Sequence, residues 1–124
     1  TDNSTAETNL VEKLTLEQVL QTVDAAFTAS QNHIKPYLSA LLTHRVLCEL
    51  DAAKVDSTVI VVVLRNARFS DTEHGRTLIR LFFEVASFPT QEDIAKQFGK
   101  DKTDASRTIS VFIKKLQKVC QPAE

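Results

Sequence analysis

Side chains that carry acid–base or metal chemistry are few in this chain and stand far apart. The three histidines, His33, His44 and His74, have no second histidine or carboxylate three or four residues further on to complete a metal-binding helix face. The two cysteines, Cys48 and Cys120, lack the C-x-x-C spacing of a zinc site, and two glycines are too few for a Gly-rich phosphate loop. We therefore expect no metal and no cofactor.

Asp71 and Glu73 stand next to His74, and together they have the residue types of an acid–base cluster. The cluster falls where the pattern predicts the start of a helix. Carboxylates at that position complement the partial positive charge of the helix dipole. We interpret the cluster as a helix start and expect that the protein is not an enzyme.

Residues 90–109, TQEDIAKQFGKDKTDASRTI, carry the most specific pattern in the chain. Thr90 is a good N-cap for a short helix, Gly99 follows where a left-handed residue commonly ends a helix, and Asp101 can cap the next one. Ala95 and Ala105 are the small residues at which the two helices are expected to cross closely. The apolar stripe of the second helix consists of Ala105, Ile109, Phe112, Ile113, Leu116 and Val119.

This segment resembles the helix-turn-helix of MarR-type and related bacterial regulators in the pattern Gln91-x-x-Ile94-Ala95-x-x-Phe98-Gly99-x-Asp101-x-x-x-Ala105-Ser106-Arg107-x-Ile109. MarR-type proteins continue into a β-hairpin wing, whereas only residues 112–124 remain here. The closing helix is more similar to the wingless modules of LuxR-type regulators and sigma-factor C-terminal regions. We assign no family beyond the motif.

The resemblance implies a sequence-specific DNA-binding transcriptional regulator. In a helix-turn-helix the second helix enters the major groove, and the first crosses the phosphate backbone. Arg107 would then form a bidentate pair with guanine, while Thr90 and Gln91 would donate to a phosphate at a helix N-terminus. The residues expected at the DNA are Thr90, Gln91, Lys102, Thr103, Ser106, Arg107, Ser110 and Lys114.

The preceding residues are expected to form further helices, so the predicted fold class is all-α. Apolar residues at helical spacing predict one helix from Thr15 to about Ser30 and a second from Pro36 to about residues 51–54. Ser70 or Asp71 is the expected cap of a later helix that stops before residue 89.

The stretch 58–64 is ambiguous, and a single β-strand is possible there. Its run VIVVVL at residues 59–64 is rich in β-branched residues, which favours a strand. No second convincing strand exists to satisfy the ladder hydrogen bonds. The stretch is therefore either a buried helix capped by Asp56 or Ser57, or a strand that pairs with its own copy in a dimer.

We divide the chain into a flexible tail (1–13), a helical dimerisation region (14–70) and a helix-turn-helix DNA-binding region (71–124), within one compact domain. The helix at 36–50 is apolar on more than one face, which is typical of a central core helix or a subunit interface. One motif makes too few contacts for tight binding. The expected partners are therefore double-stranded DNA and a second copy of the chain.

Charge and length suggest a soluble, cytoplasmic protein without membrane contact. The chain has 124 residues, with 15 Lys and Arg against 16 Asp and Glu. Residues 1–31 carry a net charge of −4 and residues 90–124 a net charge of +2, so the C-terminal end is the better place for DNA. The longest apolar run, 59–64, is too short to cross a bilayer, and two cysteines do not build a disulfide scaffold.

A second class of function fits the same residues. Three-helix units of this register also serve as protein-interaction modules, and Asp101 and Asp104 would repel phosphate. The alternative is a non-enzymatic adaptor or interaction subunit whose helix-turn-helix contacts protein rather than DNA. The residues specify no small-molecule effector for either class.

Overall fold

Helix α2 (Lys35–Ala52) is the framework of the computed structural model, which describes residues 16–84 and 87–120. No strand occurs in these two ranges, so the predicted all-helical class is confirmed. The expected tail at 1–13 and the start of the first helix lie outside the described residues. The other elements are an N-terminal helix over residues 16–28, η1 (Asn32–Ile34), α3 (Ser57–Arg65), η2 (Arg68–Ser70), α4 (Glu73–Phe83), α5 (Gln91–Gln97) and α6 (Lys102–Cys120).

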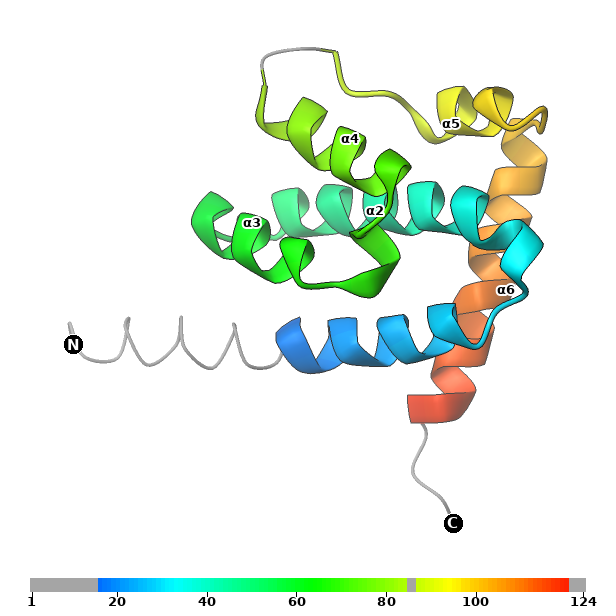
Figure 1. Cartoon of the computed structure of the whole chain (residues 1–124), viewed down its shortest axis with the longest axis horizontal. Helices are drawn as coiled ribbons and strands as arrows, with labels where there is room; N and C mark the ends of the chain where they lie inside the picture. Colours follow the sequence, from blue (N-terminus) through cyan, green and yellow to red (C-terminus); the bar gives the residue numbers. More distant parts are fainter. Residues whose placement is uncertain (1–15, 85–86, 121–124) are drawn as a thin grey trace, which may run out of the picture.

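Helix α2 crosses the middle of the molecule and packs against η2, α4, α5 and α6 (Figure 1). Pro36 lies in its first turn, where the missing N–H leaves no helix hydrogen bond unmade. Buried residues lie on more than one face of the helix: Tyr37, Leu38, Ser39, Ala40, Leu41, Leu42, Thr43, Leu47 and Leu50. The apolar members belong to one continuous core that extends from Leu20 to Phe112.

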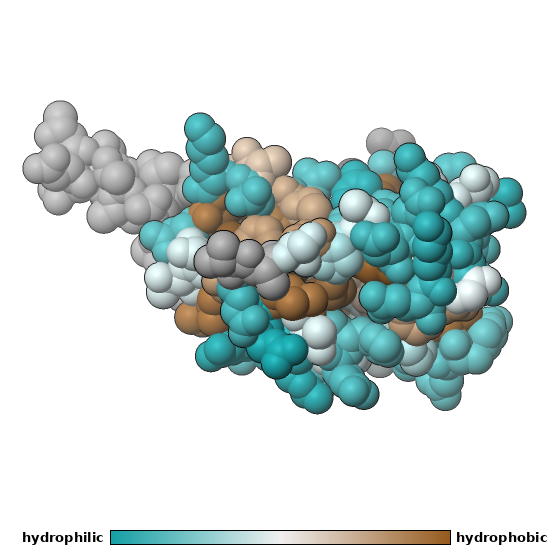
Figure 2. Space-filling view, turned by 90° about the horizontal axis from the view of Figure 1, so that it is seen from above, coloured by the Kyte–Doolittle hydropathy of each residue, from teal (hydrophilic) through white to brown (hydrophobic). Residues whose placement is uncertain are grey.

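Apolar side chains are spread unevenly over the face of the molecule that is seen from above (Figure 2). Seen from above, apolar side chains reach the surface in the half of the molecule that holds α4, whereas the half with α5 and α6 is mainly hydrophilic (Figure 2). The large apolar side chains that are exposed within the described ranges are Val19, Val62, Phe83 and Val111.

The stretch that was ambiguous between strand and helix forms helix α3. Asp56 caps it, because the Oδ1 atom accepts a hydrogen bond of 2.8 Å from the N–H of Thr58. Ile60, Val63 and Leu64 lie on one face of the helix and are buried. Burial of this face outweighs the strand preference of the individual β-branched side chains.

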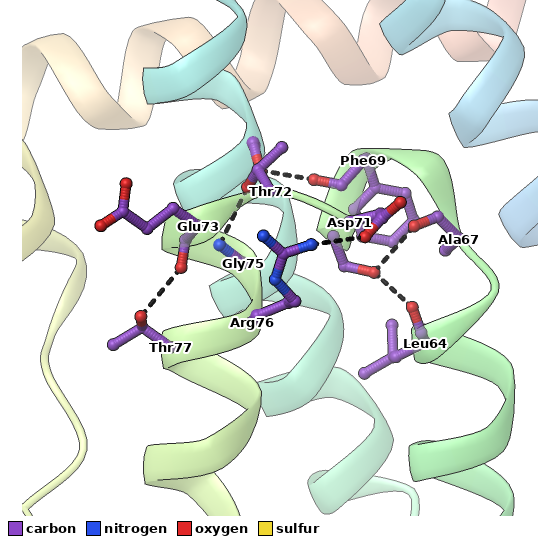
Figure 3. Close-up of polar contacts among 11 residues, drawn as sticks. Leu64, Ala67, Phe69, Asp71, Thr72, Glu73, Gly75, Arg76 and Thr77 are labelled. Carbon is purple, nitrogen blue, oxygen red and sulfur yellow. Dashed lines mark hydrogen bonds and ion pairs between the residues drawn. The ribbon is translucent and has the colours of Figure 1, made fainter.

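Helix α4 begins later than the sequence predicts. Its N-cap is Thr72, whose hydroxyl accepts a hydrogen bond of 3.0 Å from the N–H of Gly75 (Figure 3). Ser70, one of the expected caps, is buried and donates to two carbonyl groups of the α3–η2 connection, while Asp71 forms an exposed ion pair. A Cβ atom at Gly75 would lie 2.3 Å from the carbonyl oxygen of Ser70, so glycine is required for this close approach.

Ser39 of α2 connects η2 with the start of α4. This side chain is fully buried, and its hydroxyl donates to the carbonyl oxygen of Phe69 and lies 2.6 Å from Oγ1 of Thr72. The N–H of Phe69 in turn donates to Oδ1 of Asp24 at 2.9 Å. The N-terminal helix and α2 are therefore both tied to the backbone of η2, and α2 is also tied to the residue that caps α4.

His44 anchors the segment between α4 and α5 to α2. Its ring stacks on Phe88 with 5.1 Å between the ring centroids, and its Nε2 donates to the carbonyl oxygen of Pro89 at 2.9 Å. Burial lowers the pKa of His44, so the ring is neutral near pH 7. This contact fixes the chain just before α5 begins.

Two buried hydroxyls of α2, one turn apart, provide a matched test of the network around η2. Ser39→Ala should lower the free energy of unfolding by about 1–3 kcal/mol, because the Phe69 carbonyl loses its buried donor. The buried Oγ1 of Thr43 has no hydrogen-bond partner in the described part of the chain, so Thr43→Val should leave stability unchanged or raise it. Urea denaturation measures both variants, and equal losses would contradict the assignment.

Candidate nucleic-acid interface

Helix α5 begins with the cap that the sequence predicts. Oγ1 of Thr90 accepts from the N–H of Asp93 at 3.1 Å, and Oδ2 of Asp93 accepts from the N–H of Thr90 at 3.0 Å. The bond from the Thr90 backbone holds the pKa of Asp93 below its usual range. The hydroxyl oxygen and the N–H of Thr90 are thus engaged within the protein, and Gln91 beside it is half-buried.

The turn between α5 and α6 has the geometry of a Schellman motif, and the predicted roles of Gly99 and Asp101 are confirmed. Gly99 has a φ of 71°, and the N–H of Lys100 donates to the carbonyl oxygen of Ala95 at 2.8 Å. Oδ1 of Asp101 then accepts from the N–H of Asp104 at 2.7 Å. The turn therefore ends one helix and caps the next within a few residues.

Small residues let α5 and α6 approach each other, as the sequence predicts. Ala95 and Ala105 are both 0% exposed. Ile94, Ile109 and Phe112 are buried in the same core as the leucines of α2. The two helices therefore pack together and against α2 in one core.

Tyr37 of α2 supports the start of α6. Its hydroxyl donates to Oδ1 of Asp104 at 3.0 Å, and its ring centroid lies 5.2 Å from that of Phe98. The ring of His74 in α4 also packs against Phe98, with centroids 5.0 Å apart. Burial and the hydrogen bond to Asp104 raise the pKa of Tyr37 far above its ordinary value, so the hydroxyl keeps its proton. Sequence reasoning missed Tyr37 and His74, because no spacing links them to the motif.

Six of the predicted residues lie on α6 and form what we call the outward face. Each of them is exposed. Thr103, Arg107, Ser110 and Lys114 lie opposite the buried stripe of Ala105, Ile109 and Phe112, whereas Lys102 lies in the first turn in line with that stripe and Ser106 lies beside it. Thr90 and Gln91 lie at the far end of α5 and do not belong to it. The outward face consists of Lys102, Thr103, Ser106, Arg107, Ser110 and Lys114.

Helix α6 is strongly cationic. The only acidic residue within its 19 residues is Asp104, against the basic residues Lys102, Arg107, Lys114, Lys115 and Lys118. None of these cations forms an ion pair with a carboxylate in the described ranges, where the ion pairs lie on α2, α4 and α5. Asp101 and Asp104, the acids expected to repel phosphate, are both engaged in hydrogen bonds that build the helix start.

No protein family model, curated protein or solved structure matches the chain. Within residues 16–84 and 87–120, no three His, Cys, Asp or Glu side chains gather as metal ligands would. No helix in those ranges combines the length and the apolar character needed to cross a membrane. The case for a nucleic-acid interface therefore rests on the geometry and the charge of α6.

Glycine 99 offers a test of the turn that orients α6. Gly99→Val should lower the free energy of unfolding by about 1–3 kcal/mol, because a β-branched residue strongly disfavours a φ of 71°. Gly99→Asn is the control: asparagine tolerates this conformation, and no atom lies within 4 Å of a Cβ placed here. Thermal melting compares the two variants. An unchanged melting temperature for the valine variant would show that the turn does not need glycine.

Proposed function

We propose that the protein is a sequence-specific DNA-binding transcriptional regulator that acts as a homodimer. The observation that carries this proposal is the outward face of α6, a cationic helix face with hydroxyl side chains beside its arginine. In a helix-turn-helix the second helix lies in the major groove, with its early residues at the base edges. Helix α6 is then the recognition helix, and α5 crosses the phosphate backbone.

The side chains of the outward face have distinct roles in this arrangement. Arg107 lies between the two ends of the face and offers a planar fork to the O6 and N7 atoms of a guanine. Lys102 and Lys114, one toward each end of the face, contact phosphates and position the helix. Thr103 and Ser106 are short donors for either a phosphate or a base. Because the phosphate contacts release counterions, binding is expected to weaken as salt rises.

Dimerisation follows from the small size of one recognition surface. A single helix contacts only a few base pairs, and two copies on a palindrome, with recognition helices about 34 Å apart, double the contacts. Val19 of the N-terminal helix is 54% exposed and Val62 of α3 is 45% exposed. These side chains supply apolar surface within the first 70 residues, away from α6 in the sequence.

The DNA face is tested by removing its charges one at a time. Arg107→Ala should weaken binding to the best site selected from a random duplex pool by about 1–3 kcal/mol, because a base contact is lost. Lys114→Ala should weaken binding to all duplexes alike and reduce the slope of log K against log salt by about 1. Fluorescence anisotropy between about 50 and 200 mM salt measures both effects.

Arg45→Ala is the matched control for these variants. It removes the same charge from an exposed ion pair with Glu49 on α2, where Nε and Oε1 are 2.9 Å apart, and such a pair contributes little stability. The DNA affinity of this variant should equal that of the wild type. Equal affinities for the Arg107 and Arg45 variants, or no salt-dependent binding to any duplex, would overturn the proposal and favour the adaptor role.

The dimer is tested by sedimentation equilibrium at micromolar concentrations. Val19→Asp should shift the protein to monomer, because the substitution places a charge in the proposed apolar contact. Val111→Asp makes the same change on α6, where Val111 is 48% exposed, and should leave the dimer intact. A wild-type protein that stays monomeric, even when mixed with duplex DNA, would contradict the dimer.

A further inference from the structure

Helices α3 and α4 form the walls of an open groove of about 590 Å³, which we call the α3–α4 groove. The volume is within the range of about 300–1,000 Å³ that is usual for ligand sites. Its lining comes from α3 and from α4 with the residue that follows it, and none of it comes from α5 or α6. The groove is therefore separate from the outward face of α6, and α6 crosses α2 at the opposite side of the view in Figure 1.

The groove has an apolar floor that the fold leaves uncovered in the described part of the chain. Val61, Ile79 and Phe83 line it; Ile79 is buried in the core, whereas Phe83 is 39% exposed. Apolar side chains grouped in this way usually mark a surface that another molecule covers.

Arginine side chains line the groove beside its apolar residues. Arg65, Arg76 and Arg80 line the groove, and Glu84 is the only acid among its lining residues. Arg80 approaches Glu84 no closer than 3.9 Å, and both side chains are more than half exposed. Arg65 has no carboxylate within ion-pairing distance among the described residues. Arg76 pairs with Asp71 at 2.8 Å, and both side chains are exposed. A ligand that brings carboxylates to the groove thus meets Arg65, which is unpaired among the described residues, and Arg80, whose contact with Glu84 is long and exposed.

We propose that the α3–α4 groove binds an acidic amphipathic helix of a partner protein. Such a helix has apolar side chains at positions i, i+3, i+4 and i+7, which suit an apolar floor between two helices. Its flanking carboxylates complement the three arginines. This inference does not depend on DNA binding, because the groove and the outward face of α6 share no residue.

Other occupants fit the groove less well. Two copies that met through it on a two-fold axis would place the arginines of one copy against those of the other, and like charges oppose such contact. A DNA duplex would satisfy the arginines but would leave the apolar floor without a partner. The combined chemistry of floor and rim selects a ligand that is both apolar and anionic.

The test uses three synthetic peptides of 16 residues, labelled with fluorescein, and the full chain. The probe is a helix-forming Ala-rich peptide with leucines at i, i+3, i+4 and i+7 and flanking glutamates. One control peptide replaces the glutamates with lysines, and the other has the composition of the probe with its leucine spacing scrambled. Fluorescence anisotropy should show saturable micromolar binding of the probe and at least about tenfold weaker binding of both controls.

Variants of the protein locate the binding. Arg80→Glu and Phe83→Asp change exposed side chains, so the fold should be kept, and each should weaken binding of the probe at least about tenfold. Lys114→Glu makes the same charge change on α6 as Arg80→Glu and should leave probe binding unchanged. Circular dichroism and thermal melting confirm that each variant is folded.

Several outcomes would overturn the inference. If the probe does not bind, the inference is wrong. If the scrambled peptide binds as tightly as the probe, the surface attracts anions without regard to the spacing of their apolar side chains. Equal loss in the Arg80 and Lys114 variants would show a response to net charge alone. If Phe83→Asp dissolves a wild-type dimer, the occupant is a second copy instead. None of these outcomes bears on whether α6 binds DNA.

Discussion

The Ser39 hydroxyl lies fully buried where α2, η2 and α4 meet, and the arrangement of the helices depends on the hydrogen bonds made there. The η2 segment is short, so its backbone polar groups cannot all be satisfied within it, and a buried polar group without a partner is costly. Side chains from two other elements satisfy those of Phe69: Asp24 of the N-terminal helix accepts from its N–H, and Ser39 of α2 donates to its carbonyl oxygen. Gly75 then allows α4 to approach η2 without a clash.

The pair of helices α5 and α6 is oriented by contacts with the same central helix. Its own residues form the turn at Gly99 and the cap at Asp101, but they do not decide where the pair of helices sits. Tyr37 of α2 fixes the start of α6 through Asp104, and His44 of α2 fixes the chain that leads into α5. In the proposed function, α6 held in this way presents its cations in one orientation, so little order has to be gained on binding.

The two surfaces of the molecule differ in the chemistry that they offer. The outward face of α6 is hydrophilic, with cations that are not neutralised by carboxylates in the described ranges, which suits a phosphate backbone. The α3–α4 groove places arginines around an apolar floor, which suits a protein helix. In the two proposals, DNA lies at one end of α2 and a partner helix at the other. Such a partner would change DNA binding only if it altered α2 or the contact between subunits.

The sequence by itself determined the features that depend on residues a few positions apart. The Thr90–Asp93 cap, the glycine turn at residue 99 and the start of α2 at Pro36 follow from local backbone geometry, and the burial of Ala95 and Ala105 follows from helical spacing. Only the tertiary structure decided that residues 57–65 form a helix and that Thr72, not Ser70, caps α4. It also decided that Tyr37 meets Asp104, a contact that joins positions 67 apart. These outcomes depend on which surfaces are buried together, and burial depends on distant partners that no local spacing specifies.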